Sequence, residues 1–194
     1  MVVNSLLFKA YYKLLAVCVY RFRFGKFGKK SRIDAPLKLD GRKNIHIGDN
    51  VHIHYRTWLG CEPLTDCKSP ELIIDDGSVI GNFNHIYSTS YIRIGKNVLT
   101  ADKVYISDNL HSYEDPDTPV IKQPIQQLAH VTIGDGSWIG ENVCIIGASV
   151  GKHCIIGANS VVTHDNPDYC IAVGSPARVI KKFNKESRIW EKVS

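Results

Sequence analysis

His111 is the residue whose type and position best suit catalysis in this chain of 194 residues. It lies near the start of Ser107–His130, the longest interruption of an otherwise regular six-residue pattern. An imidazole titrates near neutrality, so it can accept a proton and later return it within one reaction. Loops on a rigid scaffold often carry catalytic groups. We therefore predict that His111 is a general base on a protruding loop, although an isolated exposed histidine is commonly just a polar loop residue.

Two asparagines form a second candidate group. The stretch Ile80–His85 reads IGNFNH, and Asn82 and Asn84 stand two positions apart. On a strand, residues at this spacing face the same side. This spacing predicts either a pair of amides that orient a polar ligand or a ladder of asparagines stacked on the outside of the fold.

The remaining histidines and the cysteines give weaker signals. His46, His52 and His54 lack an obvious carboxylate neighbour, so we expect outward polar residues and no metal site. The cysteines form no CxxC pair and none lies in the interruption, so we expect reduced thiols and no covalent cysteine intermediate. The six are Cys18, Cys61, Cys67, Cys144, Cys154 and Cys170.

Length and charge set broad limits on function. The length favours a single domain. The net charge of +5 favours an anionic partner, such as a nucleotide-bearing cofactor, an acidic glycan or a membrane surface. No nucleic-acid-binding motif is present, so binding to DNA or RNA is not expected.

The elements that position these residues follow from the repeat. Aliphatic residues recur every six positions from Ile45 onward, and glycine commonly follows them, as in IGDN, IGKN and IGEN. This period fits flat stretches of about five residues separated by corners, and three such sides close into a parallel β-helix. We predict this all-β domain over residues 33–177, with a loop at 107–130 whose prolines favour a fixed arm. The positions predicted to point inward are Ile47, Ile53, Leu59, Ile74, Ile80, Ile86, Ile94, Thr100, Ile106, Ile133, Ile139, Ile145, Val150, Ile156 and Val162.

Residues 1–32 are expected to form a separate N-terminal cap. Apolar residues recur at helical spacing, with Lys9 and Lys13 on the polar side. The apolar run is too short for a membrane span, and no cleavage site of a secretory signal follows it. The amphipathic helix and the basic stretch after it predict either a cap on the open end of the repeat or a contact with an anionic membrane. The apolar positions are Val3, Leu7, Ala10, Leu14 and Val17.

The pattern VTIGDGSWIGENVCII, IIGANSVVT and AVGSPARVIKKF within Val131–Phe183 resembles the hexapeptide-repeat acyltransferases, and most closely the bacterial sugar and polysaccharide O-acetyltransferases. The resemblance covers about Asn44–Phe183. It implies a left-handed β-helix, a closing C-terminal helix at 178–194, acetyl-coenzyme A as acyl donor, and a homotrimer with sites between subunits. No resident metal is implied.

The same resemblance assigns site residues. SDNLHSYED looks like the loop of the family's catalytic histidine, which makes His111 the base; Asp108, Glu114 or a backbone carbonyl is then expected to hold its other ring nitrogen. Asn82 and Asn84 correspond to a segment that lines the acceptor pocket. The acidic pair that follows this segment in some family members is replaced here by IYSTSY, which leaves the acceptor open. The positions implied to lie along the coenzyme A groove are Trp138, Glu141, Ala158, Thr163, His164, Arg178 and Lys181.

The resulting prediction is an acetyl-coenzyme-A-dependent O-acetyltransferase that acts on a sugar hydroxyl in lipopolysaccharide or surface polysaccharide biosynthesis. We expect direct transfer with a histidine base, in the cytoplasm or at the inner face of the membrane. One alternative is an N-acetyltransferase of an amino sugar or nucleotide sugar. Two others are a metal-dependent hydratase and a β-helix scaffold without catalytic activity.

Overall fold

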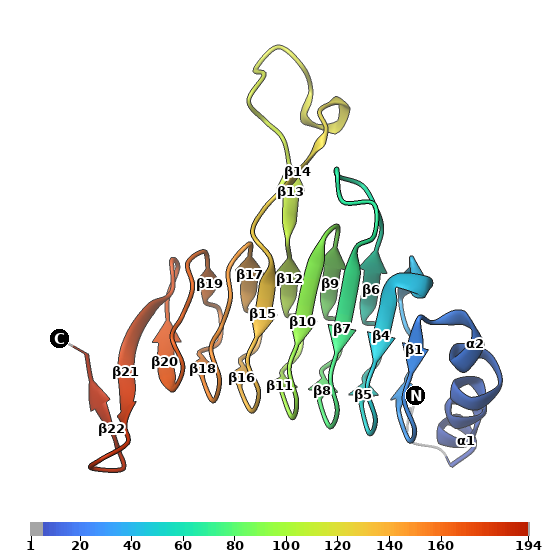
Figure 1. Ribbon diagram of the computed structural model, residues 1–194, viewed down its shortest axis with the longest axis horizontal. Helices are drawn as coiled ribbons and strands as arrows, with labels where there is room; N and C mark the ends of the chain where they lie inside the picture. The colour runs from blue at the N-terminus through green and yellow to red at the C-terminus, as the bar shows by residue number, and fades with distance from the viewer. Residues whose placement is uncertain (1–5, 194) are drawn as a thin grey trace.

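Three sheets of short strands enclose the interior and give the protein the outline of a three-sided prism (Figure 1). The computed structural model describes residues 6–193. From β1 (Lys26–Phe27) to β17 (Cys144–Ile146) each turn of the chain contributes one strand to each sheet, and the next turn pairs with it in parallel. Later turns continue the first side only through bridges at Val150 and Asn166. The fold is the left-handed β-helix that the sequence predicts.

The strands occupy the three sides as follows. The first sheet contains β1 (Lys26–Phe27), β4 (Ile45–Ile47), β7 (Glu71–Ile74), β10 (Tyr91–Ile94) and β15 (Val131–Ile133). The second contains β2 (Arg32–Ile33), β5 (His52–Ile53), β8 (Val79–Ile80), β11 (Leu99–Thr100), β16 (Trp138–Ile139), β18 (Ile155–Ile156), β20 (Cys170–Val173), β21 (Arg178–Asn184) and β22 (Ile189–Lys192). The third contains β3 (Lys38–Asp40), β6 (Trp58–Cys61), β9 (His85–Ser88), β12 (Tyr105–Ser107), β17 (Cys144–Ile146) and β19 (Val161–Val162).

The six-residue period produces the core. All fifteen positions predicted to point inward are at most 1% exposed. Each stacks on its equivalent in the neighbouring turn, as Ile86 does on Ile106 and Ile106 on Ile145. Complete burial of one such aliphatic side chain contributes about 1.5–3 kcal/mol. The aliphatic columns therefore provide most of the stabilisation and hold the corners of the prism in register.

The N-terminal boundary lies earlier than the sequence predicts. The first turn of the β-helix already begins at β1, inside the segment expected to be a cap, and Phe27 and Ile33 take the inward positions. The aliphatic repeat does not reveal this turn, because an aromatic residue takes one of its inward positions and lysines are frequent in the segment. Before it, α1 (Leu6–Leu15), a π-helical turn (Ala16–Tyr20) and α2 (Arg21–Arg23) form one helical segment at the end of the prism (Figure 1). We call Leu6–Arg23 the N-terminal helical segment.

The face that this segment buries is not the predicted one. Ala16 and Tyr20 are buried, and Tyr20 packs on Phe24 and Phe27 with ring centroids 5.4 Å away. Ala10 and Leu14, by contrast, are exposed. The π-helical turn adds residues to the turn and so rotates the apolar face away from the position that an α-helical period predicts. Among the other predicted positions, Val3 and the side chains of Leu7, Lys9 and Val17 lie outside what the structure describes. Within residues 6–193 no helix combines the length and apolar character that crossing a bilayer requires.

The C-terminal helix prediction is wrong. Residues 178–192 form the antiparallel hairpin β21–β22, which extends the second sheet beyond β20. Phe183 and Trp190 pair across the hairpin, with ring centroids 5.4 Å apart. Their contact and the free edge of β20 favour strand pairing over the helix that the resemblance implies.

The interruption of the repeat is an arm that projects from the prism (Figure 1). Its two sides, β13 (Asn109–His111) and β14 (Ile125–Gln127), pair in antiparallel fashion. A 3₁₀ turn at Val120–Lys122 lies in its tip. A second 3₁₀ turn, Arg42–Asn44, precedes β4. We call residues 109–127 the arm.

Candidate active site

Asp108 anchors the arm where it leaves the prism. Its side chain is completely buried, and its carboxylate accepts hydrogen bonds from the backbone N–H groups of Thr89, Ser90 and Tyr91, each at 2.8 Å. Side chains of Ser88, Thr89 and Asn109 also donate to it. Burial alone raises the pKa of this carboxyl, but these hydrogen bonds outweigh burial and the pKa lies below its ordinary value. Asp108 is therefore an ionised clamp at the base of the arm.

The returning side of the arm is held by Gln127. Its amide nitrogen donates to the Asp108 carbonyl at 2.7 Å, and its amide oxygen accepts from Thr65 and Thr89 at 2.8 and 2.9 Å. Thr65 belongs to the loop between β6 and β7, so this second loop is fastened to the arm. The sequence reasoning missed Asp108 as an anchor and missed Gln127, because most of their partners lie 17–62 residues away in the chain.

His111 lies on the outgoing side of the arm, opposite Ile125, and is exposed. Among the residues that the structure describes, none forms a hydrogen bond with its ring. The predicted partners are occupied elsewhere, since Asp108 clamps the base of the arm and Glu114 accepts from the backbone N–H of Tyr113. The expectation that Asp108 or Glu114 holds the imidazole is wrong. The antiparallel ribbon positions His111 through its backbone and leaves the residue exposed.

Asn82 and Asn84 do not face the same way. They lie in a corner between β8 and β9, where Phe83 has a φ of +56°, and not on a strand. Asn84 is buried at 1% exposure; its amide donates to Thr100 and its oxygen accepts from the backbone of Val104. It is a structural residue, so the prediction that it contacts an acceptor is wrong. Asn82 is half-buried and donates to Asp102 at 3.1 Å; its role in acceptor binding stays a prediction.

The histidines near the start of the β-helix have carboxylate neighbours that the sequence did not indicate. Nε2 of His52 lies 2.7 Å from Asp34, and Nε2 of His46 lies 4.0 Å from Glu71. Turns stacked 18–25 residues apart bring them together. Within residues 6–193 no group of three or more His, Cys, Asp or Glu side chains is arranged to hold a metal ion. All six cysteines are free thiols, as the sequence predicts.

Most of the predicted cofactor positions lie together on the second sheet. Strand pairing places Trp138, Ile155, Ile171 and Lys181 in one row, and the Trp138 ring is 48% exposed. Glu141 and Ala158 follow the corner at the end of their strands, and Arg178 pairs with Val173 at the same edge. We call Trp138, Glu141, Ala158, Arg178 and Lys181 the groove group.

Two predicted cofactor residues stand apart from the groove group. Thr163 and His164 follow β19 at the next corner, where both are exposed and their side chains lie 3.0 Å apart. Ala177, next to Arg178, donates from its backbone to Val161, which brings the chain back toward this corner. Glu141 is also already partnered, since it lies 3.4 Å from Lys103.

The arm and the groove group lie on different sides of one molecule. The arm leaves after β12 and returns before β15, so it stands at the corner between the third and first sheets. In a three-sided prism this corner is opposite the second sheet. Figure 1 shows the arm rising from one side and β16 and β18 running along the other. His111 and Trp138 of the same chain therefore cannot meet in one site.

Comparison with known proteins gives consistent likenesses. Residues 130–164 match the model of the hexapeptide repeat of succinyl-transferase. The chain is 36% identical to the putative lipopolysaccharide biosynthesis O-acetyl transferase WbbJ of Escherichia coli K12, over 62% of this chain and 65% of that protein. It is 30% identical to the galactoside O-acetyltransferase of the same organism, over 85% of this chain and 67% of that protein. The match to WbbJ thus spans just under two thirds of that relative's length.

A solved structure shares the architecture. A mutant of AntD, an N-acyltransferase from Bacillus cereus in complex with dTDP-4-amino-4,6-dideoxyglucose and coenzyme A, superposes with a TM-score of 0.71 at 20% identity. The alignment covers 86% of this chain and 88% of that one. At this identity the likeness supports the fold.

Proposed function

Since this chain belongs to the hexapeptide-repeat acyltransferase family, we propose that it transfers an acetyl group from acetyl-coenzyme A to a sugar hydroxyl during synthesis of a surface polysaccharide. The observation that carries the proposal is His111, an exposed imidazole without a hydrogen-bond partner among the described residues, on an arm fixed by the buried Asp108. The O-acetyltransferase names of the two E. coli relatives support the choice of a hydroxyl acceptor. The donor is a cytoplasmic metabolite, so the reaction belongs in the cytoplasm.

The chemistry of the arm follows from one imidazole acting twice. Acetyl-coenzyme A supplies a thioester, whose carbonyl carbon is attacked by the acceptor oxygen. His111 accepts the hydroxyl proton as the new C–O bond forms. It then returns that proton to the sulfur as the C–S bond breaks, so free thiol and acetylated sugar leave and the imidazole is neutral again. The anchored ribbon keeps the ring in place for both proton transfers.

The groove group fits the acyl donor. Arg178 and Lys181 form no ion pair within residues 6–193, so they are available for phosphate groups. The exposed ring of Trp138 offers a flat apolar wall. Gly140 leaves the Ala158 backbone uncovered, because a Cβ at position 140 would lie 2.7 Å from the Ala158 nitrogen. The chain of acetyl-coenzyme A that carries the thioester is narrow and contains amide groups, so it needs such access to backbone groups.

We also propose that the site is shared between copies of the chain. The arm and the groove group face different sides of one prism, so a complete site needs the arm of one subunit against the groove group of the next. A closed ring of three copies satisfies this head-to-tail requirement and gives three equal sites. His111 then acts on a donor that is held by the neighbouring subunit.

Loss of the groove cations is expected to weaken donor binding more than turnover. Arg178→Gln and Lys181→Gln together should raise KM for acetyl-coenzyme A about tenfold or more, because charge-assisted hydrogen bonds to phosphate are lost. The value of kcat should stay within about twofold, because the two cations bind the donor equally well in the ground state and in the transition state. Steady-state kinetics checks this, with Lys152→Gln as a matched control that removes an exposed lysine away from the groove group. An unchanged KM in the double variant would remove these residues from the donor site.

Transfer of labelled acetyl from acetyl-coenzyme A to a glycan extract tests the function directly. The expected product carries label that mild alkali releases, as an O-acetyl ester does. Alkali-stable label would instead identify an N-acetyltransferase. Transfer that required added zinc would point to metal chemistry. If the intact trimer transferred acetyl to no glycan or amino-sugar acceptor, the result would favour a β-helix scaffold without catalytic activity.

A further inference from the structure

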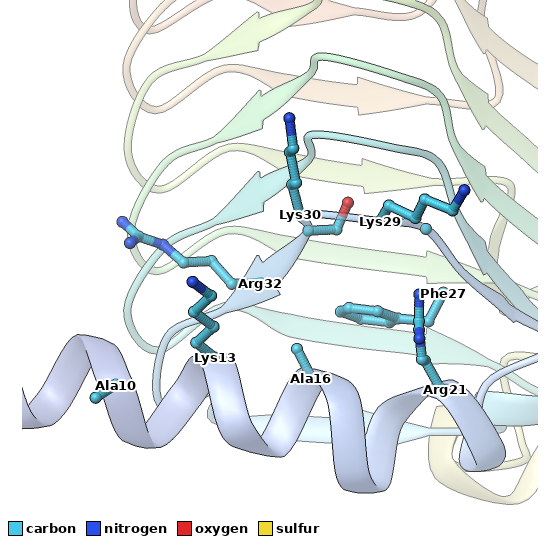
Figure 2. A pocket seen from close by; sticks show the side chains of 10 residues that line it. Ala10, Lys13, Ala16, Arg21, Phe27, Lys29, Lys30 and Arg32 are labelled. Carbon is cyan, nitrogen blue, oxygen red and sulfur yellow. The ribbon is translucent and has the colours of Figure 1, made fainter.

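A basic cavity separates the N-terminal helical segment from the first turn of the β-helix. Its volume is about 660 Å³, and its lining contains five cationic side chains and no Asp or Glu. Figure 2 shows Lys13 and Arg21 on the helical segment, facing the strand and corner that carry the other three, with Phe27 between them. The five are Lys13, Arg21, Lys29, Lys30 and Arg32.

Most of this charge is not neutralised. Arg32 shares Asp34 with His52, at 3.6 Å from the carboxylate. The other four cations form no ion pair within the described residues 6–193. Four like charges around one cavity repel each other, and a ligand that carries phosphate relieves this repulsion. The cavity is therefore complementary to an anion with several oxygen atoms.

The helical segment also carries exposed apolar side chains that do not line the cavity. Tyr11, Leu14 and Phe22 are 56%, 61% and 75% exposed, and Cys18 between them is exposed as well. Tyr11 and Leu14 are three residues apart on α1 and so lie on one side of it, and Cys18 and Phe22 continue the exposed apolar run through and beyond the π-helical turn. The packed side, with Ala16 and Tyr20, faces the prism instead. We call Tyr11, Leu14, Cys18 and Phe22 the outer ridge.

Charge is divided unequally along the chain. Residues 1–43 contain eleven Lys or Arg and two Asp, a net charge of +9. Residues 44–194 contain thirteen Lys or Arg against seventeen Asp or Glu, a net charge of −4. The strongly positive part is the end of the prism that carries the helical segment (Figure 1). An anionic surface would therefore attract this end and repel the remainder.

From these features we propose that the protein docks end-on to an anionic phospholipid membrane. The cavity takes the phosphate-bearing headgroup of an anionic lipid, and the outer ridge enters the boundary between headgroups and acyl chains. A soluble phosphate compound would use the cations but leave the ridge exposed to water, so a lipid accounts for both. The arm stands on a side of the prism and stays clear of the membrane (Figure 1). This docking does not depend on the acyl-transfer chemistry.

Co-sedimentation of the full chain with vesicles tests the proposal. We expect binding to phosphatidylcholine vesicles that contain phosphatidylglycerol, little binding to phosphatidylcholine alone, and weakening at high salt. The cavity variant Arg21→Gln, Lys29→Gln, Lys30→Gln should lower the partition coefficient at least about tenfold, since each basic residue near the surface contributes separately. The matched control Lys68→Gln, Lys122→Gln, Lys152→Gln removes the same charge elsewhere and should lower it much less.

A second variant separates the ridge from the charge. Leu14→Ser with Phe22→Ser changes two exposed side chains, so folding is preserved, and it should also reduce vesicle binding by about tenfold. Equal losses in the cavity and control variants would overturn a specific site. Binding of inorganic phosphate in calorimetry, without retention by any vesicle, would assign the cavity to a soluble ligand. A ridge variant that changed the oligomeric state in sedimentation velocity, while keeping vesicle binding, would make the ridge a contact between copies.

Discussion

His111→Asn is expected to lower kcat/KM for acetyl transfer by about 10²–10⁴-fold. The imidazole is the exposed group on the arm that can both accept and return a proton during the reaction, and general acid–base catalysis contributes on this scale. Because asparagine keeps polarity and size, the arm should keep its conformation. The loss should therefore appear in kcat, while KM for acetyl-coenzyme A changes little, and steady-state kinetics with the labelled donor separates the two.

His130→Asn is the matched control for this variant. His130 is exposed at the base of the same arm, where its ring lies 3.1 Å from the Ser90 hydroxyl. An amide preserves a polar contact there, so activity should stay within a few-fold of wild type. Equal losses in both variants would show that the arm is sensitive to any change. Full activity of His111→Asn would remove the proton-transfer role altogether.

Asp108→Ala is expected to reduce the free energy of unfolding by about 3–5 kcal/mol, because it leaves buried donors without their charged acceptor. Three backbone N–H groups and three side chains lose their partner at once. Urea titration measures the effect. Asp66→Ala removes an exposed carboxylate from the neighbouring loop and should change stability by less than about 0.5 kcal/mol.

The same carboxylate predicts a pH dependence. The pKa of Asp108 is lower in the folded than in the unfolded protein, because the hydrogen bonds it accepts outweigh the effect of burial. Its stabilisation is complete above the ordinary carboxyl pKa of about 3.9 and is lost as pH falls from there through the folded-state value. Asp108→Asn should flatten this part of the stability curve. An identical acid limb in wild type and variant would contradict the assignment.

Asp108 also positions His111 without touching it. A displaced arm should lower kcat in Asp108→Asn while the protein is still folded, and the pH profile of kcat should keep its shape because the base is unchanged. A profile that shifts with the variant would instead place Asp108 in the proton path.

The sequence predicts the parts of this protein that repeat. Ile86, Ile106 and Ile145 stack in one column and occupy the same position of the six-residue repeat. Each has the same buried environment, so their burial can be predicted from the spacing alone. The arm is visible for the same reason, as the place where the period stops. The ends of the β-helix are harder to predict from the sequence, because Phe27 there takes the place of an aliphatic residue.

Features made by stacking of distant turns could not be predicted. The partners of Asp108 lie in the preceding turn, and Asn84 faces inward because its segment is a corner with a left-handed residue at Phe83. One π-helical turn displaced the face of the N-terminal helix. At the C-terminus, pairing of Phe183 with Trp190 and an open strand edge decided between helix and hairpin.

The strands on either side of the arm meet their neighbours as though nothing had been inserted. Tyr105 pairs with His85 below and Cys144 above, and Ile94 pairs with Ile133, so both flanking turns keep their register. An insertion of this kind adds nothing to the aliphatic columns and takes nothing from them. The arm is thus a module that evolution or an engineer can lengthen, shorten or exchange at a single junction. The arm can therefore differ among such proteins while the scaffold that folds stays constant.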